Sequence, residues 1–314
     1  MPEAGPIALL RPPADVDLGP LPVDRCVAVT GFRPDHDALA ARGIPVAADL
    51  PPRAALAIVF LPRAKALARD LIARAAAVVG PGGMILVDGA KGDGVEAVLR
   101  AVRTVAPVGE VRSKAHGKVF AIGANAALAA WRALPIEADG FRTAPGTFSA
   151  DAVDPGTALL IESLPPLSGR VCDLGAGWGA LSRAVLASGA VTALDLIEAE
   201  RAALDCARAN VPDPRAAFHW ADATTWRGGP YDAVVTNPPF HAGRSADADL
   251  GRAFIATAAR TLKASGRLLL VANRQLPYEG ALGAAFAEVA VRAEARGYKV
   301  IDAARPVRRK GRQG

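Results

Sequence analysis

Short apolar runs alternate with longer segments of helical periodicity along most of the chain. In the first half, Ala55–Leu61 and Met84–Val87 are predicted to be strands, and Lys65–Val79 between them has apolar residues at helical spacing. Cys26–Thr30 is a further strand candidate, and Val95–Val105 is a further helix candidate. Strands that alternate with helices indicate a parallel α/β sheet.

The second half repeats this alternation. Its predicted strands are Val171–Leu174, Val191–Leu196, Ala216–Trp220, Tyr231–Thr236 and Arg267–Ala272, with helices at 180–188, 199–210 and 250–262. Near the end of each half, Val111–Gly117 and Val291–Gly297 share four of seven residues. The common order of elements and this match together predict a duplication.

The segment Trp131–Gly156 is rich in proline and glycine and separates the two halves. We therefore expect a domain over residues 1–135, a second over 136–304, and a basic tail over 305–314. Five of the 37 basic residues lie in Arg305–Arg312, and the net charge of the whole chain is +6. This modest excess permits an anionic partner such as RNA without establishing one.

Composition excludes several classes of protein. The chain of 314 residues is 51% hydrophobic, enough to build folded cores. Its three cysteines form no CxxC pair, so a disulfide framework or zinc ribbon is not indicated, and the four histidines have no metal-ligand spacing. The first residues lack signal-peptide character, and no apolar run reaches the roughly 18 residues of a membrane helix. We expect a cytoplasmic protein, acting as a monomer, with no metal and no membrane partner.

A glycine-rich loop, Asp173-Leu-Gly175-Ala-Gly177-Trp-Gly179, follows a predicted strand and precedes a predicted helix. Glycines let the backbone turn tightly and approach a ligand closely. The GxGxG spacing differs from the GxGxxG of dinucleotide sites, and it suits S-adenosylmethionine, which has no phosphate. A purely structural turn is the alternative.

Two acidic residues follow the next two predicted strands. Asp195 is expected to end its strand about 20 residues after the loop, where a carboxylate can accept ribose hydroxyls of either NAD or S-adenosylmethionine. Asp222, with Ala223 beside it, follows the third strand and can accept from an adenine amino group. A helix N-cap is the other interpretation of Asp222.

The tetrapeptide Asn237-Pro238-Pro239-Phe240 ends another predicted strand. Two prolines cannot continue a sheet, and a rigid loop at the carboxyl end of a parallel strand is where α/β proteins bind ligands. The Asn237 side-chain oxygen and the Pro238 carbonyl then offer two fixed acceptors for a planar amino group, and Phe240 offers a face for stacking a base. With both hydrogens accepted, the nitrogen lone pair can attack a methyl sulfonium without a strong general base.

The combination resembles class I methyltransferases that act on planar amino nitrogens, and more narrowly the ribosomal RNA small subunit methyltransferase C family, which methylates guanine N2 of 16S rRNA. The resemblance covers nearly the whole chain. It is carried by 145–151 with Asp154-Pro-Gly-Thr157, by Asp173–Gly179, by Asn237-Pro-Pro-Phe-His241 with Gly243, and by Leu61-Pro-Arg-Ala-Lys65.

The resemblance implies two tandem Rossmann-like class I methyltransferase domains, the first degenerate, with S-adenosylmethionine as cofactor and ribosomal RNA or a ribosomal subunit as partner. The implied cofactor residues are Asp173, Gly175, Gly177, Gly179, Asp195, Asp222, Ala223, Phe148 and Asn237, and the implied catalytic residues are Asn237, Pro238 and Phe240. It assigns no role to Trp178 or His241. Cys26–Gly31 has no DxGxG loop, and Phe60-Leu61-Pro62-Arg63 lacks the asparagine, so the first domain is not expected to methylate.

Five other functions stay open on the residues alone. The acceptor can be adenine N6, a large-subunit rRNA guanine or a protein glutamine. A non-catalytic RNA-binding factor with a methyltransferase fold is opposed by the intact Asp173, Asp195 and Asn237. An NAD-dependent oxidoreductase is opposed by the glycine spacing and by the Asn-Pro-Pro-Phe loop.

Overall fold

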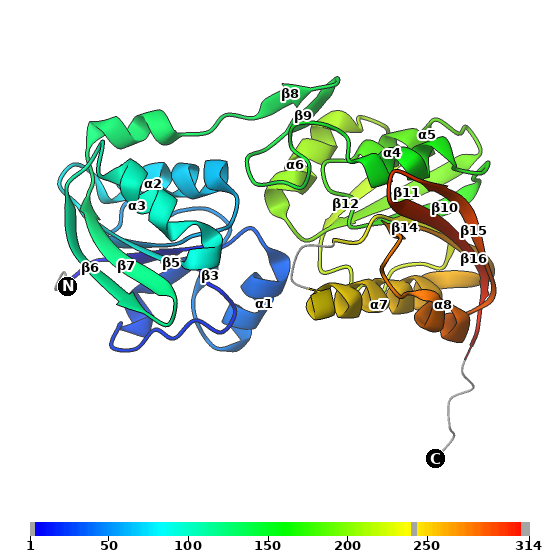
Figure 1. Cartoon of the computed structure of the whole chain (residues 1–314), viewed down its shortest axis with the longest axis horizontal. Coiled ribbons are helices and arrows are strands. Elements are labelled where there is room, and N and C mark those ends of the chain that lie inside the picture. Colours follow the sequence, from blue (N-terminus) through cyan, green and yellow to red (C-terminus); the bar gives the residue numbers. More distant parts are fainter. Residues whose placement is uncertain (1–3, 240–243, 309–314) are drawn as a thin grey trace, which may run out of the picture. The chain divides into compact units, whose positions relative to one another are not determined.

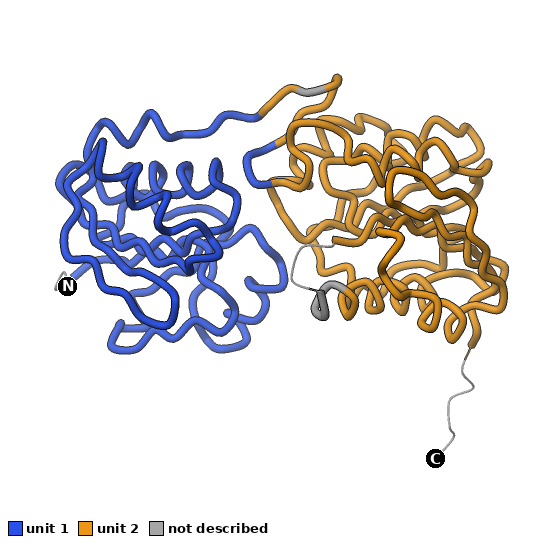
Figure 2. Tube along the Cα trace, viewed as in Figure 1, with its two compact units in different colours: residues 1–135, 144–146 blue, residues 136–143, 147–314 orange. Residues whose placement is uncertain are grey.

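The computed structural model describes residues 4–239 and 244–308. It divides into two compact units, which Figure 2 colours separately. Unit 1 comprises residues 1–135 and 144–146, and unit 2 comprises residues 136–143 and 147–314. Each unit is described by itself.

Unit 2 contains a seven-stranded sheet in the order β12-β11-β10-β13-β14-β16-β15. The first five of these strands run parallel, and β16 pairs antiparallel with both β14 and β15. The strands are β10 (Gly169–Leu174), β11 (Val191–Glu198), β12 (Ala216–Trp220), β13 (Tyr231–Thr236), β14 (Leu262–Asn273), β15 (Phe286–Ala295) and β16 (Tyr298–Pro306). A separate hairpin pairs β8 (Ile136–Ala138) with β9 (Phe141–Thr143).

Helices cover both faces of this sheet (Figure 1). One face carries α4 (Pro155–Glu162), α5 (Ala180–Leu186) and α6 (Arg201–Asn210), and the other carries α7 (Arg244–Thr261) and α8 (Glu279–Ala285). Neighbouring residues of β10 point to opposite faces of the sheet. Val171 belongs to the cluster of Leu160 and Leu181 on one face, and Cys172 belongs to the cluster of Ile255 on the other. Such alternation explains why these central strands are apolar throughout.

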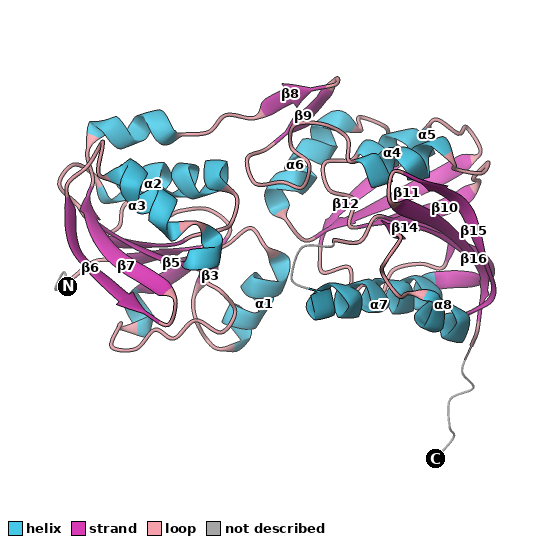
Figure 3. Cartoon of the chain, in the orientation of Figure 1, coloured by secondary structure: helices cyan, strands magenta, loops and turns pink. Residues whose placement is uncertain are grey.

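Unit 1 repeats this arrangement with the strand order β3-β2-β1-β4-β5-β7-β6. Its strand β7 lies between β5 and β6 and pairs antiparallel with both. Its strands are β1 (Ile7–Leu10), β2 (Cys26–Val29), β3 (Val46–Ala47), β4 (Leu56–Phe60), β5 (Met84–Ala90), β6 (Val108–Lys114) and β7 (Gly117–Gly123). Its helices are α1 (Arg33–Ala41), α2 (Lys65–Val79), α3 (Val95–Val102) and the short η1 (Val23–Arg25), η2 (Lys91–Asp93) and η3 (Ala126–Trp131). Figure 3 shows this mixture of helix and strand, and the predicted fold class of two Rossmann-like units is confirmed.

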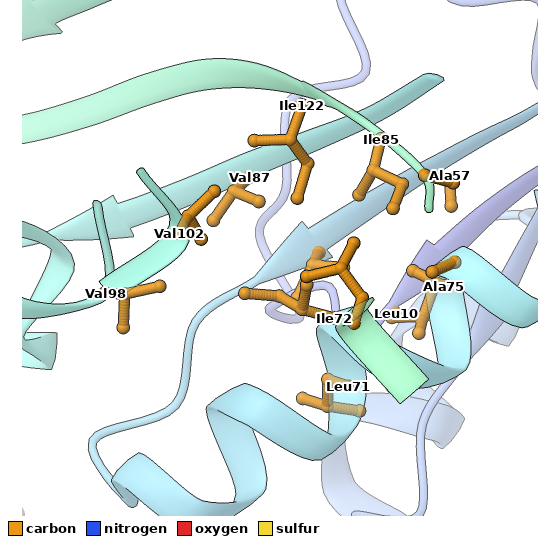
Figure 4. Packing of buried hydrophobic residues seen from close by; sticks show 14 of the residues in the cluster. Leu10, Ala57, Leu71, Ile72, Ala75, Ile85, Val87, Val98, Val102 and Ile122 are labelled. Atoms are coloured by element: carbon orange, nitrogen blue, oxygen red, sulfur yellow. The ribbon is translucent and has the colours of Figure 1, made fainter. Parts of the chain in front are cut away.

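The core of unit 1 is built from small aliphatic side chains. Figure 4 shows Ile72 and Ala75 of α2 against Ile85 of β5 and Leu10 of β1, with Val98 of α3 beside them. All of these side chains are buried. Aliphatic contacts of this kind supply the core that a chain with few aromatic residues needs.

The predicted strand at Cys26 is present as β2, but its expected correspondence to the strand before the glycine loop is wrong. The central strand of unit 1 is β1, a run of only four residues (Ile7–Leu10), and the Cys26 strand is its neighbour β2. The glycine loop of unit 2 therefore corresponds to the segment after β1, which reads Arg11-Pro12-Pro13 and also lacks DxGxG. A four-residue run between a proline and an arginine was too short for the periodicity to detect.

The predicted basic tail, residues 305–314, begins inside the last strand. β16 continues to Pro306, which is buried and pairs with Phe286. Arg308 then donates to the Leu262 carbonyl at 2.6 Å. Main-chain pairing thus anchors this segment to the sheet, and residues 309–314 lie outside the described range. Within that range, no helix is both long and apolar enough to cross a membrane.

Candidate functional site

The candidate site of unit 2 lies at the carboxyl ends of β10 and β13, its two central strands. From β10 the chain moves to β11 and β12 on one side, and then returns to β13 on the other. Ligands of open α/β sheets bind at such a reversal. Asp173 near the end of β10 and Asn237 directly after β13 are brought together there.

The glycine loop after β10 needs its glycines for conformation. Gly175, Gly177 and Gly179 have φ angles of +75°, +56° and +93°, a region that other residues rarely adopt. A side chain at Gly179 would also place its Cβ 2.8 Å from Val211. The main chain is tied to β11, because the Gly175 and Ala176 N–H groups both donate to the Ile197 carbonyl.

Asp173 presents a buried acceptor next to this loop. Its Oδ2 accepts from the Ser182 hydroxyl at 2.6 Å, and its buried Oδ1 accepts no hydrogen bond among the described residues. Burial raises the pKa of Asp173 to about 7, even though the Ser182 hydrogen bond opposes the shift. A cationic ligand group at Oδ1 would satisfy this carboxylate.

The sequence analysis missed Glu198, the last residue of β11. Its Oε2 accepts from the Gly177 N–H at 2.8 Å, and its Oε1 accepts from the Glu200 N–H at 2.7 Å. Burial raises the pKa of Glu198. The segment reads Leu194-Asp-Leu-Ile-Glu198, so the sequence offered two acids in one strand and no local sign of which one reaches its end.

The expectation that Asp195 ends its strand is wrong. β11 continues to Glu198, and Asp195 pairs with Cys172, two residues before the end of β10. Its buried carboxylate is engaged by Arg170 at 2.8 Å, His219 at 2.9 Å and Tyr231 at 2.8 Å. Burial alone would raise the pKa of Asp195, but these partners outweigh it and lower the pKa. The carboxylate therefore holds β11, β12 and β13 together.

Asp222 lies in the turn after β12. Its Oδ1 accepts from the N–H of Thr224 at 2.8 Å and from the Thr224 hydroxyl at 2.7 Å. No helix starts there, so Asp222 caps a turn and not a helix. Ala223 is buried in the cluster that contains Leu174 and Ile197. A contact between these two residues and a ligand stays a prediction.

Asn237 has a defined amide orientation. Its Nδ2 donates to Asp154 Oδ2 at 3.0 Å and to Thr157 Oγ1 at 2.8 Å, both at the start of α4. Its buried Oδ1 accepts no hydrogen bond among the described residues. Pro238 beside it is buried, whereas Phe240 and His241 lie outside the described residues.

Trp178 and Phe148 connect the glycine loop to the segment before α4. Trp178 Nε1 donates to the Phe148 carbonyl at 2.9 Å, and the Trp178 ring packs on Phe141 of β9 with centroids 4.9 Å apart. Asn210 Nδ2 donates to the Trp178 carbonyl at 2.7 Å. Trp178 is 6% exposed, so it braces the loop, a role that the sequence left undecided.

One cavity collects five of the predicted residues: Phe148, Asp173, Gly175, Gly177 and Asn237. Its lining consists of Phe148, Ser149, Asp154, Thr157, Asp173, Gly175, Ala176, Gly177, Trp178, Ala180, Leu181 and Asn237. The predicted residues Gly179, Asp195, Asp222, Ala223 and Pro238 are not part of this lining.

The chemistry of this lining fits S-adenosylmethionine. The described lining contains no lysine or arginine, and Asp173 keeps an unsatisfied carboxylate oxygen there, which suits a sulfonium with an ammonium group better than a pyrophosphate. The two unsatisfied acceptors, Asp173 Oδ1 and Asn237 Oδ1, both belong to it. Within the described part of the chain, no cluster of three or more His, Cys, Asp or Glu side chains could hold a metal.

Comparisons with known proteins agree with this geometry. A family model described as the methyltransferase small domain matches residues 139–302. The chain is 31% identical over 260 residues to the ribosomal RNA small subunit methyltransferase C of Shewanella amazonensis, covering 77% of this chain and 75% of that one. Its counterpart from Shewanella oneidensis is 29% identical over 256 residues, with the same coverage.

A solved structure matches both units. It is a T. thermophilus methyltransferase for N2 of guanine 1207 in 16S rRNA, in complex with AdoMet and guanosine. The match has a TM-score of 0.82 and 28% sequence identity, and it covers 97% of this chain and 89% of that chain.

The hydrogen bonds of Asp195 lead to a stability prediction. Asp195→Asn should lower the free energy of unfolding of unit 2 by about 3 kcal/mol at pH 7, because buried donors lose a charged partner. The folded pKa of Asp195 is lowered, so its stabilisation is present above the unfolded pKa and is lost as the pH falls through the folded one. The deficit should therefore shrink in acid.

Tryptophan fluorescence during denaturation measures this, since three of the four tryptophans belong to unit 2. Asp205→Asn, which removes an exposed partner of Arg208, is the matched control and should change stability by less than about 1 kcal/mol. Equal effects of the two variants would contradict the structural role of Asp195.

Proposed function

The chain belongs to the methyltransferase small domain family and, within it, to the ribosomal RNA small subunit methyltransferase C family, and on that premise we propose which of its residues perform the methyl transfer. Membership confirms the predicted enzyme class, an S-adenosylmethionine-dependent methyltransferase of 16S rRNA that acts on guanine N2. We propose that the modified guanine is the one equivalent to position 1207 of the T. thermophilus substrate.

The observation that carries the residue assignment is the buried, unpartnered Oδ1 of Asn237 in the cavity beside the glycine loop. An amide oxygen is a good acceptor for an exocyclic amine, and the Pro238 carbonyl follows it directly on a rigid backbone. We propose that these two oxygens accept the two hydrogens of guanine N2. The nitrogen lone pair then points away from both oxygens, toward the methyl group.

S-adenosylmethionine, when bound, supplies an electrophilic methyl group on a sulfonium. The residues of the chain position the amine, exclude water and hold the cofactor. Asn237 is a neutral amide and removes no proton, and none has to be removed before the transfer, because the amine becomes acidic only once it carries the methyl group. The methylated nitrogen then loses its extra proton to solvent. Positioning and preorganised acceptors therefore account for the step. Phe240 is proposed to stack on the guanine.

We propose that Asp173 Oδ1 receives the ammonium group of the cofactor, over the loop of Gly175, Gly177 and Gly179. Glu198 takes the ribose role that was expected of Asp195, because Glu198 lies at the carboxyl edge and Asp195 does not. Asp222 and Ala223 remain proposed for the adenine, since they follow β12 at the same edge. Phe148 closes over the loop from the segment that Trp178 holds.

We propose that unit 1 does not methylate, because its β1 is followed by Arg11-Pro12-Pro13 and its β4 by Leu61-Pro62, without the required acid, glycines or asparagine. The chemistry needs no second copy, since all the assigned side chains come from one unit of one chain. We therefore propose a monomer that works in the cytoplasm, where its ribosomal substrate is assembled, and that uses no metal.

The first test identifies the acceptor. The protein is incubated with labelled cofactor and separately with naked 16S rRNA, 30S and 50S particles, and the nucleosides are then separated. We expect N2-methylguanosine from the small-subunit substrates. Asn237→Ala should lower kcat by ~100-fold or more and leave cofactor affinity within about twofold, because the interaction it removes forms only with the acceptor. Label in methyladenosine or in protein would contradict the proposed function.

A second test distinguishes the two acids of β11. Glu198→Gln should weaken S-adenosylmethionine binding by ~10-fold, because an amide is a poorer acceptor for ribose hydroxyls than a carboxylate. Asp195→Asn should leave that affinity within about twofold at a temperature where it is folded. Titration calorimetry measures both, and the reverse ranking would restore the ribose role to Asp195.

A third test uses the raised pKa of Asp173. Only the ionised carboxylate pairs with the cofactor ammonium, so affinity should weaken by up to ~10-fold per pH unit as the pH falls below about 7. Calorimetry measures this affinity from pH 5.5 to 7.5. This range lies below the usual pKa of an α-amino group, so the cofactor ammonium stays protonated throughout. Asp173→Asn should abolish the slope, and Ser182→Ala should move it to higher pH by removing the stabilising hydrogen bond. An affinity independent of pH would refute the pairing.

A further inference from the structure

The stretch Asp154-Pro155-Gly156-Thr157 contributes to the family resemblance, but the proposed chemistry has so far given it no role. It forms the start of α4, where Asp154 is the N-cap and its Oδ2 accepts from the Thr157 N–H at 2.9 Å. Pro155 occupies the first helical position, where its missing N–H costs nothing. A Cβ on Gly156 would lie 2.7 Å from the ring of Tyr298, so this turn packs closely on β16.

Asp154 also does something that a helix cap does not require. The same Oδ2 that caps α4 accepts a hydrogen of Asn237 Nδ2 at 3.0 Å, and Thr157 Oγ1 accepts at 2.8 Å. An amide nitrogen has two hydrogens, and both are thereby directed at α4. With the amide reversed, Asn237 Oδ1 would face a carboxylate oxygen, and two acceptors repel each other.

The orientation matters because both hydrogens of the amide are used by α4, which leaves Asn237 Oδ1 as the atom that can meet a ligand. It is buried and accepts no hydrogen bond among the described residues. Asp154 is 8% exposed, so water competes weakly for its carboxylate. A negative group next to the amide hydrogens also polarises the amide, which makes Oδ1 a stronger acceptor.

We propose that Asp154, together with Thr157, is a positioning residue for methyl transfer: it fixes the Asn237 amide so that Oδ1 faces the target amine. The proposal rests on the function proposed for Asn237. Asp154 acts through Asn237 and does not touch the amine. Its loss should therefore affect turnover and spare the binding of either substrate.

The experiment compares four variants of the full chain. Asp154→Ser keeps a good N-cap but withdraws the carboxylate from Asn237, so kcat should fall by ~10-fold or more. Cofactor affinity and the KM for RNA should stay within about twofold. Asp154→Asn keeps an oxygen at the same reach and should recover most of the lost kcat. Thr157→Val removes one acceptor and should give a smaller loss of the same kind.

Glu162→Gln is the matched control, because it removes an exposed acidic charge at the other end of α4, where Glu162 pairs with Arg296. It should leave kcat unchanged. If Asp154→Ser does not fold, Thr157→Val alone must show a fall in kcat at constant affinity for the proposal to stand.

Two failures can be told apart. Wild-type protein that forms no N2-methylguanosine would overturn the proposed function. Active wild-type protein with an unchanged kcat in Asp154→Ser would overturn the positioning role alone. A parallel loss of cofactor affinity and melting temperature in Asp154→Ser, without recovery in Asp154→Asn, would also overturn it, because Asp154 would then act only as a helix cap.

Discussion

The chemistry proposed for this chain depends on where the two amide hydrogens of Asn237 point. Both are held by the first turn of α4, through Asp154 and Thr157, and the side-chain oxygen is buried and accepts no hydrogen bond from the described residues. A buried acceptor without a donor is costly in a folded protein, and it persists only where the surroundings enforce it. The proposed acceptor site is thus maintained by hydrogen bonds on the opposite side of the same amide.

A similar cost appears at Asp173, on the other side of the cavity. Its carboxyl group is buried with one oxygen unsatisfied, and burial raises its pKa to about 7. The two unsatisfied oxygens suit different ligand groups. The carboxylate oxygen of Asp173 suits a cation, and the amide oxygen of Asn237 suits a neutral amine. Trp178 and Glu198 brace the glycine loop, which lines the same cavity as Asp173 and Asn237.

Sequence reasoning predicted the fold well, because the apolar runs of a buried parallel sheet are nearly continuous and easily recognised. It predicted the glycine loop after β10 and the proline-rich turn after β13, since glycines and prolines restrict the backbone locally. It failed where the outcome depends on register. Asp195 and Glu198 lie in one strand, and only the pairing of β11 with β10 shows which of them reaches the carboxyl edge. The contact from Asp154 to Asn237 spans 83 residues, so no local pattern could predict it.

The two units share a sheet topology but differ in the side chains at its reversal point, so comparing them shows what the fold alone provides. Both units have the same strand order and the same antiparallel strand, so both have a reversal point at the carboxyl ends of their central strands. In unit 1 that point carries Arg11 and Leu61, where unit 2 has the glycine loop and Asn237. The architecture therefore supplies a place for a ligand, and a few side chains with unsatisfied acceptors decide whether chemistry occurs there. A duplicated unit can lose those acceptors without losing its fold, because a buried polar atom without a partner lowers stability.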